Sequence, residues 1–206
     1  MRNPVLNRKM IIKINPENPD KKAVEKAAEI IKKGGLVVFP TDTVYGLLGD
    51  ARNKRAVGKI FKIKKRPKTK PLAIFVKDIK MAGEHAFFNE KQAKFLKRNW
   101  PGEITVILKA KNNLPEGLAA ENKTIGIRIP DYKLIDSLFE KINFPLAQTS
   151  ANISGNQATT KIKEVLKQFT DKKTMPDLIV DTGDLPENKP SKIIDLTREK
   201  PLIIRF

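Results

Sequence analysis

Three short segments carry side chains whose type and spacing could do chemistry on a charged ligand. The first is Pro40-Thr41-Asp42-Thr43, which follows the apolar run Val37-Val38-Phe39. The apolar run favours a buried strand, and Pro40 should end its pairing because proline has no N–H to donate. Because open α/β sheets bind ligands at the carboxyl ends of strands, these hydroxyls and this carboxylate are candidate ligand contacts. An ordinary strand-to-turn edge is the alternative, and Asp42 could be either a metal ligand or a turn-capping carboxylate.

The second segment is Thr149-Ser150-Ala151-Asn152-Ile153-Ser154-Gly155. A short apolar strand delivers hydroxyls and an amide into a turn that ends in glycine. Such neutral groups can orient the oxygens of a phosphate or a carboxylate. An Asx or Ser turn, which these residues also form routinely, is the alternative.

The third segment is basic and contains Lys64, Arg66, Lys68 and Lys70. Their alternation would point the side chains to one face of an extended segment. An arginine can hold two phosphate oxygens, whereas a lysine acts as a point charge. The chain has neither a G-x-x-x-x-G-K-[ST] loop nor a G-x-G-x-x-G turn, so side chains would supply the phosphate contacts. A solvated basic turn or an RNA-contacting loop would have the same composition.

Arg128 is the only charged residue in Gly126-Ile127-Arg128-Ile129-Pro130. It could clamp a carboxylate. Strand alternation by itself instead favours a position on the outward side, with the isoleucines inward.

Composition excludes several other kinds of site. The 206 residues include no cysteine, which rules out disulfides, thiolate ligands and thiol catalysis. His85 is the single histidine, so histidine-cluster metal sites and Ser-His-Asp hydrolysis are poorly supported, and we expect His85 to be structural or exposed. The formal net charge of +18 attracts polyanions such as nucleic acid, although lysines scattered over solvated faces would give the same charge.

The chain lacks the sequence signs of export or membrane insertion. No apolar run approaches the roughly 20 residues of a membrane span. Residues Met1 to Lys9 contain no apolar signal core. A cytoplasmic location and no membrane partner are the simplest expectations.

The elements that must position these residues follow from apolar periodicity and end signals. Helices are predicted from an Asp20 cap to Gly34-Gly35, from an Asn53 cap to before Pro67, from an Asn89 cap to Trp100, over Tyr132–Lys141, and from a Thr160 cap to Phe169. Strands are predicted at 37–39, 71–76, 104–108, 125–129, 146–149, 178–180, 193–196 and 202–204. This interleaving predicts one α/β domain with a mixed sheet.

The motifs and their order resemble a known family. PTDTVYGL, KKRPKTKPL, PGEITVIL, GIRIP, TSANISG, SKIIDLT and the terminal LIIRF resemble the YrdC family along nearly the whole chain. The match is closest to its stand-alone threonylcarbamoyl-AMP synthases, the TsaC type. The paired Lys-x-Arg and Ser-x-Asn signatures of that family correspond to Lys64–Arg66 and Ser150–Asn152.

This resemblance implies a fold and an activity. The fold is a single α/β YrdC-like domain over residues 1–206, with a twisted mixed parallel/antiparallel sheet and flanking helices around a basic cavity, and with no additional C-terminal domain. The activity is L-threonylcarbamoyladenylate synthesis, a nucleotidyl transfer that yields threonylcarbamoyl-AMP and pyrophosphate from L-threonine, bicarbonate and ATP. The ATP is a substrate and is accompanied by Mg²⁺. Other proteins of the pathway then use the product for threonylcarbamoyladenosine modification of tRNA.

The resemblance also implies roles for individual residues. The expected threonine contacts are Thr43, Arg128, Gln148 and Ser191, and the expected ATP contacts are Lys64, Arg66, Lys70, Thr124, Ser150, Asn152 and Arg205. Catalysis is assigned to Lys64, Arg66, Ser150 and Asn152, and no protein ligand to a metal is assigned. Phe75 departs from the family because relatives often carry histidine there, which leaves amino-acid selectivity open.

Two alternatives from other classes stay open beside the synthase. A non-catalytic RNA-binding protein would account for the charge, and direct RNA binding could also accompany the synthase activity. A carbamoyl-adenylate-forming module that uses carbamoyl phosphate would share the fold.

Overall fold

The computed structural model describes residues 10–15, 21–169 and 175–206. Its strands are β1 Met10–Lys13, β2 Val37–Phe39, β3 Gly46–Asp50, β4 Ala73–Phe75, β5 Ala86–Phe87, β6 Ile104–Ala110, β7 Thr124–Arg128, β8 Leu146–Ser150, β9 Leu178–Asp181, β10 Lys192–Asp195 and β11 Leu202–Arg205. Its helices are α1 Lys21–Lys32, α2 Lys54–Lys64, α3 Ile79–His85, α4 Glu90–Asn99, α5 Lys133–Lys141 and α6 Ile162–Gln168. Asp20, the predicted cap of the first helix, and the segment Met1 to Lys9 lie outside the described residues.

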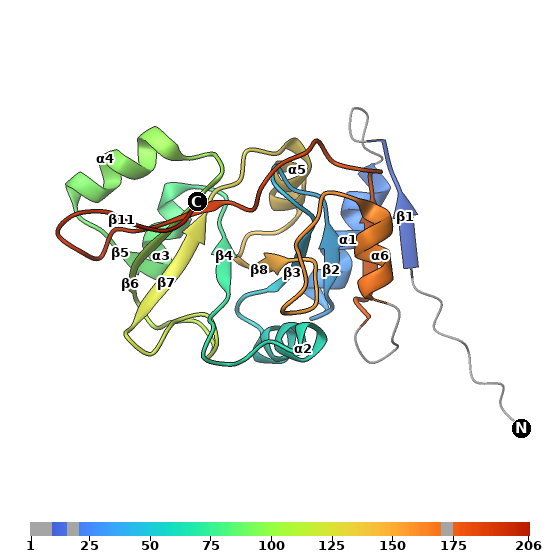
Figure 1. The fold of residues 1–206 in the computed structure, drawn as a ribbon, viewed down its shortest axis with the longest axis horizontal. Coiled ribbons are helices and arrows are strands. Elements are labelled where there is room, and N and C mark those ends of the chain that lie inside the picture. Colours follow the sequence, from blue (N-terminus) through green and yellow to red (C-terminus); the bar gives the residue numbers. More distant parts are fainter. Residues whose placement is uncertain (1–9, 16–20, 170–174) are drawn as a thin grey trace, which may run out of the picture.

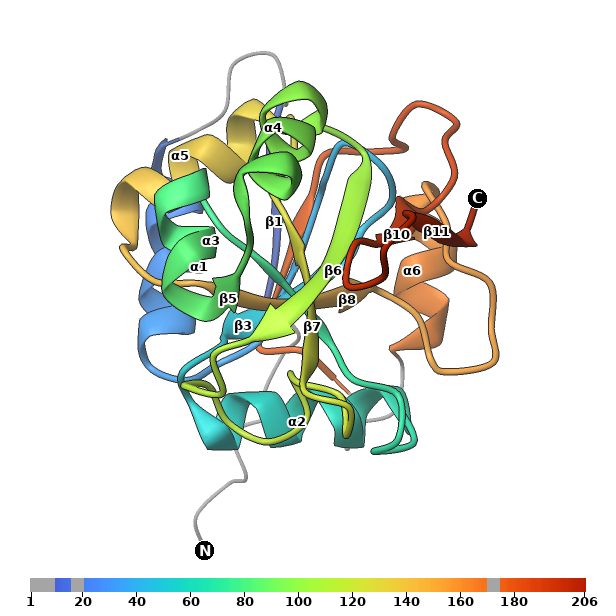
Figure 2. The same cartoon turned by 90° about the vertical axis from the view of Figure 1, so that its left-hand side faces the viewer.

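These strands form one mixed sheet, as predicted. The order is β1-β9-β2-β3-β8-β4-β7-β6-β10-β11, with β5 paired to β6. The pairs of β9 with β1 and β2, of β4 with β7 and of β10 with β6 are parallel, and the others are antiparallel. Strands β1 and β11 therefore lie at opposite ends of the sheet (Figure 1). Helices α1, α3 and α5 gather on one side and α6 lies on the other (Figure 2).

No helix among the described residues is long and apolar enough to cross a membrane.

The centre of the sheet is buried on both faces, which explains one strand missing from the sequence expectations. Leu47 and Leu48 of β3 are both fully buried, so the strand shows no polar alternation. Gly46 begins this strand and Gly49 lies within it, and glycine weakens the sequence pattern of a strand. A Cβ on Gly49 would lie 2.6 Å from Leu36 Cδ2, so a larger residue there would force the buried Leu36 side chain to move. The segment after Thr43 is thus a strand and not only a turn.

Other differences from the sequence expectations concern short elements. Strands β1 and β5 and helix α3 were not predicted, and each is only a few residues long. The predicted Thr160 cap is wrong because α6 begins at Ile162. The Ile162 N–H donates to Asp184 Oδ1 at 3.0 Å, so a distant carboxylate supplies the acceptor.

Two predicted caps are confirmed. Asn53 Oδ1 accepts the N–H groups of Arg55 and Ala56 at 2.9 and 3.2 Å, and this starts α2. Asn89 and Gln92 form a capping box at the start of α4. The carboxyl end of α2 leads directly into the basic segment, because Lys64 is the last residue of this helix.

We expect Asn53→Ala to lower the free energy of unfolding by about 0.5–2 kcal/mol, because two N–H groups lose their acceptor. Urea unfolding monitored by circular dichroism measures this loss. Asn53→Asp keeps an oxygen acceptor and should unfold close to the wild type. Equal losses in both variants would show that the cap hydrogen bonds do not stabilise α2.

Candidate active site

A cavity of about 170 Å³ lies among the ends of β4, β7, β8, β10 and β11. Most of the predicted site residues line it, namely Thr43, Arg66, Arg128, Gln148, Ser150, Ser191 and Arg205. They come from the β2–β3 loop, the segment after α2, and four strands or their flanks. Val44, Leu72, Phe75 and Ile193 complete an apolar part of the wall. Residues far apart in sequence thus meet at one small cavity.

Arg128 is buried at the end of β7, with 2% of its surface exposed. Its Nη2 donates to Asp42 Oδ2 at 2.7 Å, its Nη1 to Thr43 Oγ1 at 3.1 Å and its Nε to the Gly102 carbonyl at 2.8 Å. Burial lowers the pKa of Arg128, and the Asp42 carboxylate opposes that shift. The outward position that strand alternation favoured is wrong, because Asp42, Thr43 and Gly102 cover the Arg128 side chain.

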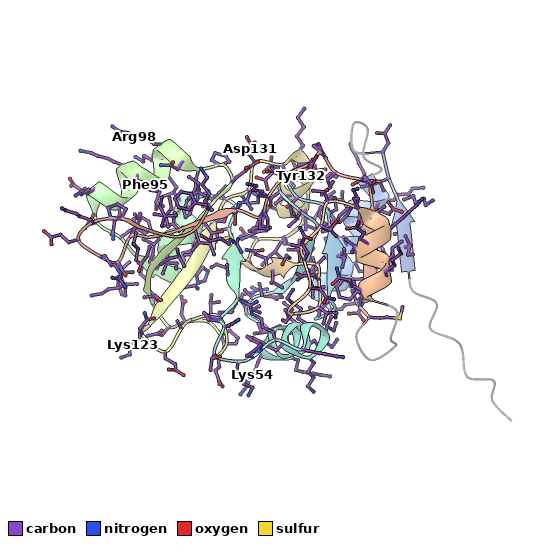
Figure 3. All side chains as sticks on the ribbon, viewed as in Figure 1. Lys54, Phe95, Arg98, Lys123, Asp131 and Tyr132 are labelled. Atoms are coloured by element: carbon purple, nitrogen blue, oxygen red, sulfur yellow. The ribbon has the colours of Figure 1, made fainter. Side chains whose placement is uncertain are left out.

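The role of Asp42 becomes clear from this contact. Its Oδ2 also accepts the backbone N–H of Asp131 at 2.9 Å. Asp131 lies at the entry to α5 (Figure 3). Its Oδ1 is buried and has no hydrogen-bond partner among the described residues. The described residues contain no group of three or more His, Cys, Asp or Glu side chains that could hold a metal ion. Asp42 is therefore an ion-pair partner of Arg128. It also accepts a backbone N–H, as the turn-capping alternative expected of a carboxylate.

The turn before β3 fixes Thr43 beside Arg128. Thr41 Oγ1 donates to the Val44 carbonyl at 2.7 Å and accepts the Thr43 N–H at 3.2 Å. Both threonines are buried. The two interpretations of this segment are therefore compatible. The hydrogen bonds of the turn hold the Thr43 hydroxyl at the cavity, where it can contact a ligand.

A second cationic region is formed by Arg66 and Arg205. Arg205 Nη2 donates to the Ser191 carbonyl at 2.6 Å, and Arg66 Nε donates to the Lys70 carbonyl at 2.7 Å. Burial lowers the pKa of Arg66, and the charge of Arg205 lowers it further. Neither guanidinium pairs with a carboxylate of the described residues. Two neighbouring cations with no such partner make this wall of the cavity a candidate anion site.

Lys64 is buried behind the cavity wall and does not line it. Its Nζ donates to the Ser150 carbonyl at 2.6 Å, to the Asn152 carbonyl at 2.6 Å and to Asn152 Oδ1 at 2.9 Å. Asn152 is also buried and outside the lining. Of the Lys64, Ser150 and Asn152 group predicted to touch ATP, only Ser150 faces the cavity.

Burial also changes the titration of Lys64, whose pKa falls from 10.5 to about 7, and the nearby Arg66 charge adds to this shift. The unfolded chain therefore binds a proton at Lys64 that the folded chain releases between pH 7 and 10.5, so this group makes stability rise with pH. We expect the difference in unfolding free energy between wild type and Lys64→Met to rise by about 1.4 kcal/mol per pH unit above pH 7. Denaturant unfolding of both proteins from pH 6 to 9.5 measures it. A constant difference would mean that the three acceptors keep the ammonium protonated.

Other predicted residues lie outside the cavity lining. The Lys70 side chain is exposed, and Thr124 Oγ1 donates to Asn122 Oδ1 at 2.7 Å at the start of β7. His85 is buried and its Nδ1 lies 3.0 Å from Asn113 Oδ1, which fits the structural role expected for it.

Sequence reasoning missed Thr105, whose Oγ1 lies 2.9 Å from Ser191 Oγ in the cavity wall. Its polar type inside the apolar strand β6 was the available signal.

Comparison of the sequence with known proteins gives consistent relatives. Residues 29–206 match the Sua5/YciO/YrdC family profile, which is described as telomere recombination. Escherichia coli (strain K12) YciO, an uncharacterized protein, is 33% identical over 193 residues, covering 93% of this chain and 92% of YciO. A Methanocaldococcus jannaschii protein provisionally named threonylcarbamoyl-AMP synthase is 38% identical over 197 residues, covering 95% of this chain and 91% of its own.

Comparison of the structure agrees with these relatives. Pyrococcus abyssi Sua5 complexed with L-threonine has a TM-score of 0.88 and 32% identity, covering 96% of this chain. This chain spans only 57% of that longer protein. The crystal structure of E. coli YciO has a TM-score of 0.86 and 30% identity, covering 96% of this chain and 95% of YciO. The predicted α/β fold is thus confirmed, and the chain belongs to the Sua5/YciO/YrdC family.

Proposed function

We propose that this protein is an L-threonylcarbamoyladenylate synthase, a nucleotidyltransferase that makes threonylcarbamoyl-AMP and pyrophosphate from L-threonine, bicarbonate and ATP. The observation that carries the proposal is that three arginines line one cavity, and that only Arg128 pairs with a carboxylate of the described residues. We assign Arg128, which lies beside the Thr43 hydroxyl, to a first region, and Arg66 and Arg205 to a second. An amino-acid carboxylate suits the first region, and a polyphosphate suits the second. Two relatives support this assignment by name, the provisionally named threonylcarbamoyl-AMP synthase of M. jannaschii and a P. abyssi protein named threonylcarbamoyl-AMP synthase.

The threonine region is assigned to Arg128, Thr43, Gln148 and Ser191. Arg128 has five N–H donors, and its contacts with Asp42, Thr43 and Gly102 use three of them. One N–H on each terminal nitrogen is then left for a carboxylate. The complex of P. abyssi Sua5 with L-threonine supports an amino-acid site in this fold.

The ATP region is assigned to Arg66, Arg205 and Ser150 as direct contacts. Lys64 and Asn152 act from behind the wall by holding the Ser150 turn. Lys70 and Thr124 stay predicted ATP contacts, although they lie outside the cavity lining. Mg²⁺ would enter with ATP and would be held mainly by phosphate oxygens and water.

The reaction needs positioning more than a protein nucleophile. The threonine amine attacks the bicarbonate carbon and water leaves, which gives a carbamate. A carbamate oxygen then attacks the α-phosphorus of ATP, and the bond to pyrophosphate breaks. Arg66 and Arg205 neutralise the phosphate charge, and Arg128 holds the carboxylate. The apolar wall with Phe75 and Leu72 limits the water that would return the carbamate to free amine.

Pyrophosphate release from Mg-ATP and bicarbonate, with and without L-threonine, tests this proposal. Serine and carbamoyl phosphate are tested in parallel, and mass spectrometry identifies the adenylate. Release that requires both threonine and bicarbonate supports the synthase. Release that requires carbamoyl phosphate instead identifies a carbamoylating module. No release by folded protein that binds RNA with steep salt dependence would favour the RNA-binding alternative.

The remaining parts of the proposal concern the cellular context. The product passes to other proteins that modify tRNA, and direct RNA binding by the basic surface stays a prediction. A cytoplasmic location and a single domain over residues 1–206 belong to the same proposal.

A further inference from the structure

The hydrogen bonds of Lys64, Asn152 and Ser150 have a fixed direction. In its ammonium form Lys64 carries only donors, and the Asn152 atom 2.9 Å from Lys64 Nζ is the accepting amide oxygen Oδ1. The Asn152 Nδ2 group donates to the Asn156 and Ile153 carbonyls at 2.7 and 3.1 Å. The reversed amide would place donors against the ammonium and an oxygen against two carbonyl oxygens. Lys64 and these carbonyls therefore fix the orientation of the Asn152 amide.

This orientation determines what Ser150 can offer to the cavity. Ser150 Oγ lies 2.6 Å from Asn152 Oδ1, which can only accept. The serine hydroxyl has a single proton, and that proton is used toward Asn152. Ser150 lines the cavity, whereas Lys64 and Asn152 do not. The Ser150 oxygen therefore faces the cavity with lone pairs and without a proton.

We propose that Lys64 is a positioning residue that makes Ser150 a hydrogen-bond acceptor, and that Ser150 accepts from an N–H or O–H donor of the bound nucleotide. The donor is a ribose hydroxyl or the adenine amino group. A phosphate oxygen is excluded as its partner because two acceptors repel each other. Phosphate contacts are left to Arg66 and Arg205, which have donors and no carboxylate partner among the described residues. This inference rests on the proposed function, since it takes ATP as the ligand.

Calorimetric titration of the full chain tests the inference with five probes. These are ATP, 2′-deoxy-ATP, 3′-deoxy-ATP, inosine triphosphate, which lacks the amino group, and tripolyphosphate, which lacks every sugar and base donor. We expect the wild type to bind one of the three altered nucleotides about 10-fold more weakly than ATP, because the Ser150 acceptor is left unpaired. In Ser150→Ala this preference should disappear, while tripolyphosphate binds as it does to the wild type. The altered nucleotide that is rejected identifies the donor.

Two further variants separate this effect from a general structural one. Ser154→Ala is the matched control, because Ser154 follows on the same turn, does not line the cavity, and its buried Oγ has no hydrogen-bond partner among the described residues. It should keep the full nucleotide preference. Lys64→Met should still bind tripolyphosphate but lose the preference, with circular dichroism as the check on folding. If Lys64→Met does not fold, Ser150→Ala against Ser154→Ala decides the outcome.

Two results would overturn the inference. One is equal binding of ATP and all three altered nucleotides by the wild type. The other is a uniform loss in Ser150→Ala that includes tripolyphosphate, which would make Ser150 a phosphate donor. In both cases the wild type would still release pyrophosphate when threonine is present, and the proposed synthase function would stand. If the wild type neither binds ATP nor releases pyrophosphate, the proposed function fails and this inference fails with it.

Discussion

Replacing Arg128 with alanine is expected to raise the KM for L-threonine about 30-fold or more, with a much smaller change in the KM for ATP. A lost charged contact to a buried partner costs about 2–5 kcal/mol, and about 2 kcal/mol corresponds to a 30-fold change. Arg128 provides the cation at the proposed threonine region, whereas Arg66 and Arg205 lie at the other. Pyrophosphate release at varied threonine and at varied ATP measures the two constants separately.

Arg128→Ala also leaves the Asp42 carboxylate buried without its cation, so the variant should lose about 3–5 kcal/mol of stability. The double variant Asp42→Asn/Arg128→Ala removes that charge and keeps an amide oxygen for the Asp131 N–H. It should recover much of the stability but none of the threonine binding. This cycle separates folding from function. A near-normal KM for threonine in the folded double variant would contradict the assigned role.

Replacing Arg66 with alanine is expected to raise the KM for ATP by a comparable factor, with little change for threonine. Arg66 lines the cavity beside Arg205, and neither pairs with a described carboxylate, so its charge is available to the polyphosphate. Its loss removes a fork that can hold two phosphate oxygens. Steady-state kinetics and calorimetric ATP binding both measure the effect.

Lys62→Ala is the matched control for Arg66→Ala. Lys62 is a nearby cation in α2, but it is exposed and does not line the cavity. It should therefore keep ATP affinity within about two-fold, because isolated surface charges contribute little. An equal loss in both variants would mean that the general positive charge of the chain, and not Arg66 itself, attracts ATP.

The features that were predictable from the sequence depend on neighbours along the chain. Asn53 and Asn89 cap α2 and α4 because a cap needs only the next two or three N–H groups. Pro40 ends β2 because it lacks a donor. The order of the motifs indicated the family because that order can be read along the chain without knowledge of the fold.

The sequence predictions that failed concerned features that depend on residues distant in the chain. Strand β3 shows no polar alternation because all of its residues are buried, with α1 and α2 packed against the strand. Thr160 does not cap α6 because Asp184, 22 residues away from Ile162, supplies the acceptor. In both cases a contact distant in sequence overrides the local preference.

The sequence by itself determined the α/β class, the caps of α2 and α4, and the types of side chain that could hold a carboxylate and a polyphosphate. Only the tertiary structure decided which of them face the cavity. Arg128 pairs with Asp42 across 86 residues, and Lys64 turns its ammonium toward Asn152 across 88 residues. A buried charge goes where its desolvation is offset by acceptors, and those acceptors exist only once the sheet has formed. For that reason Lys64 supports the site from behind, while Arg205, from the last strand, lines it.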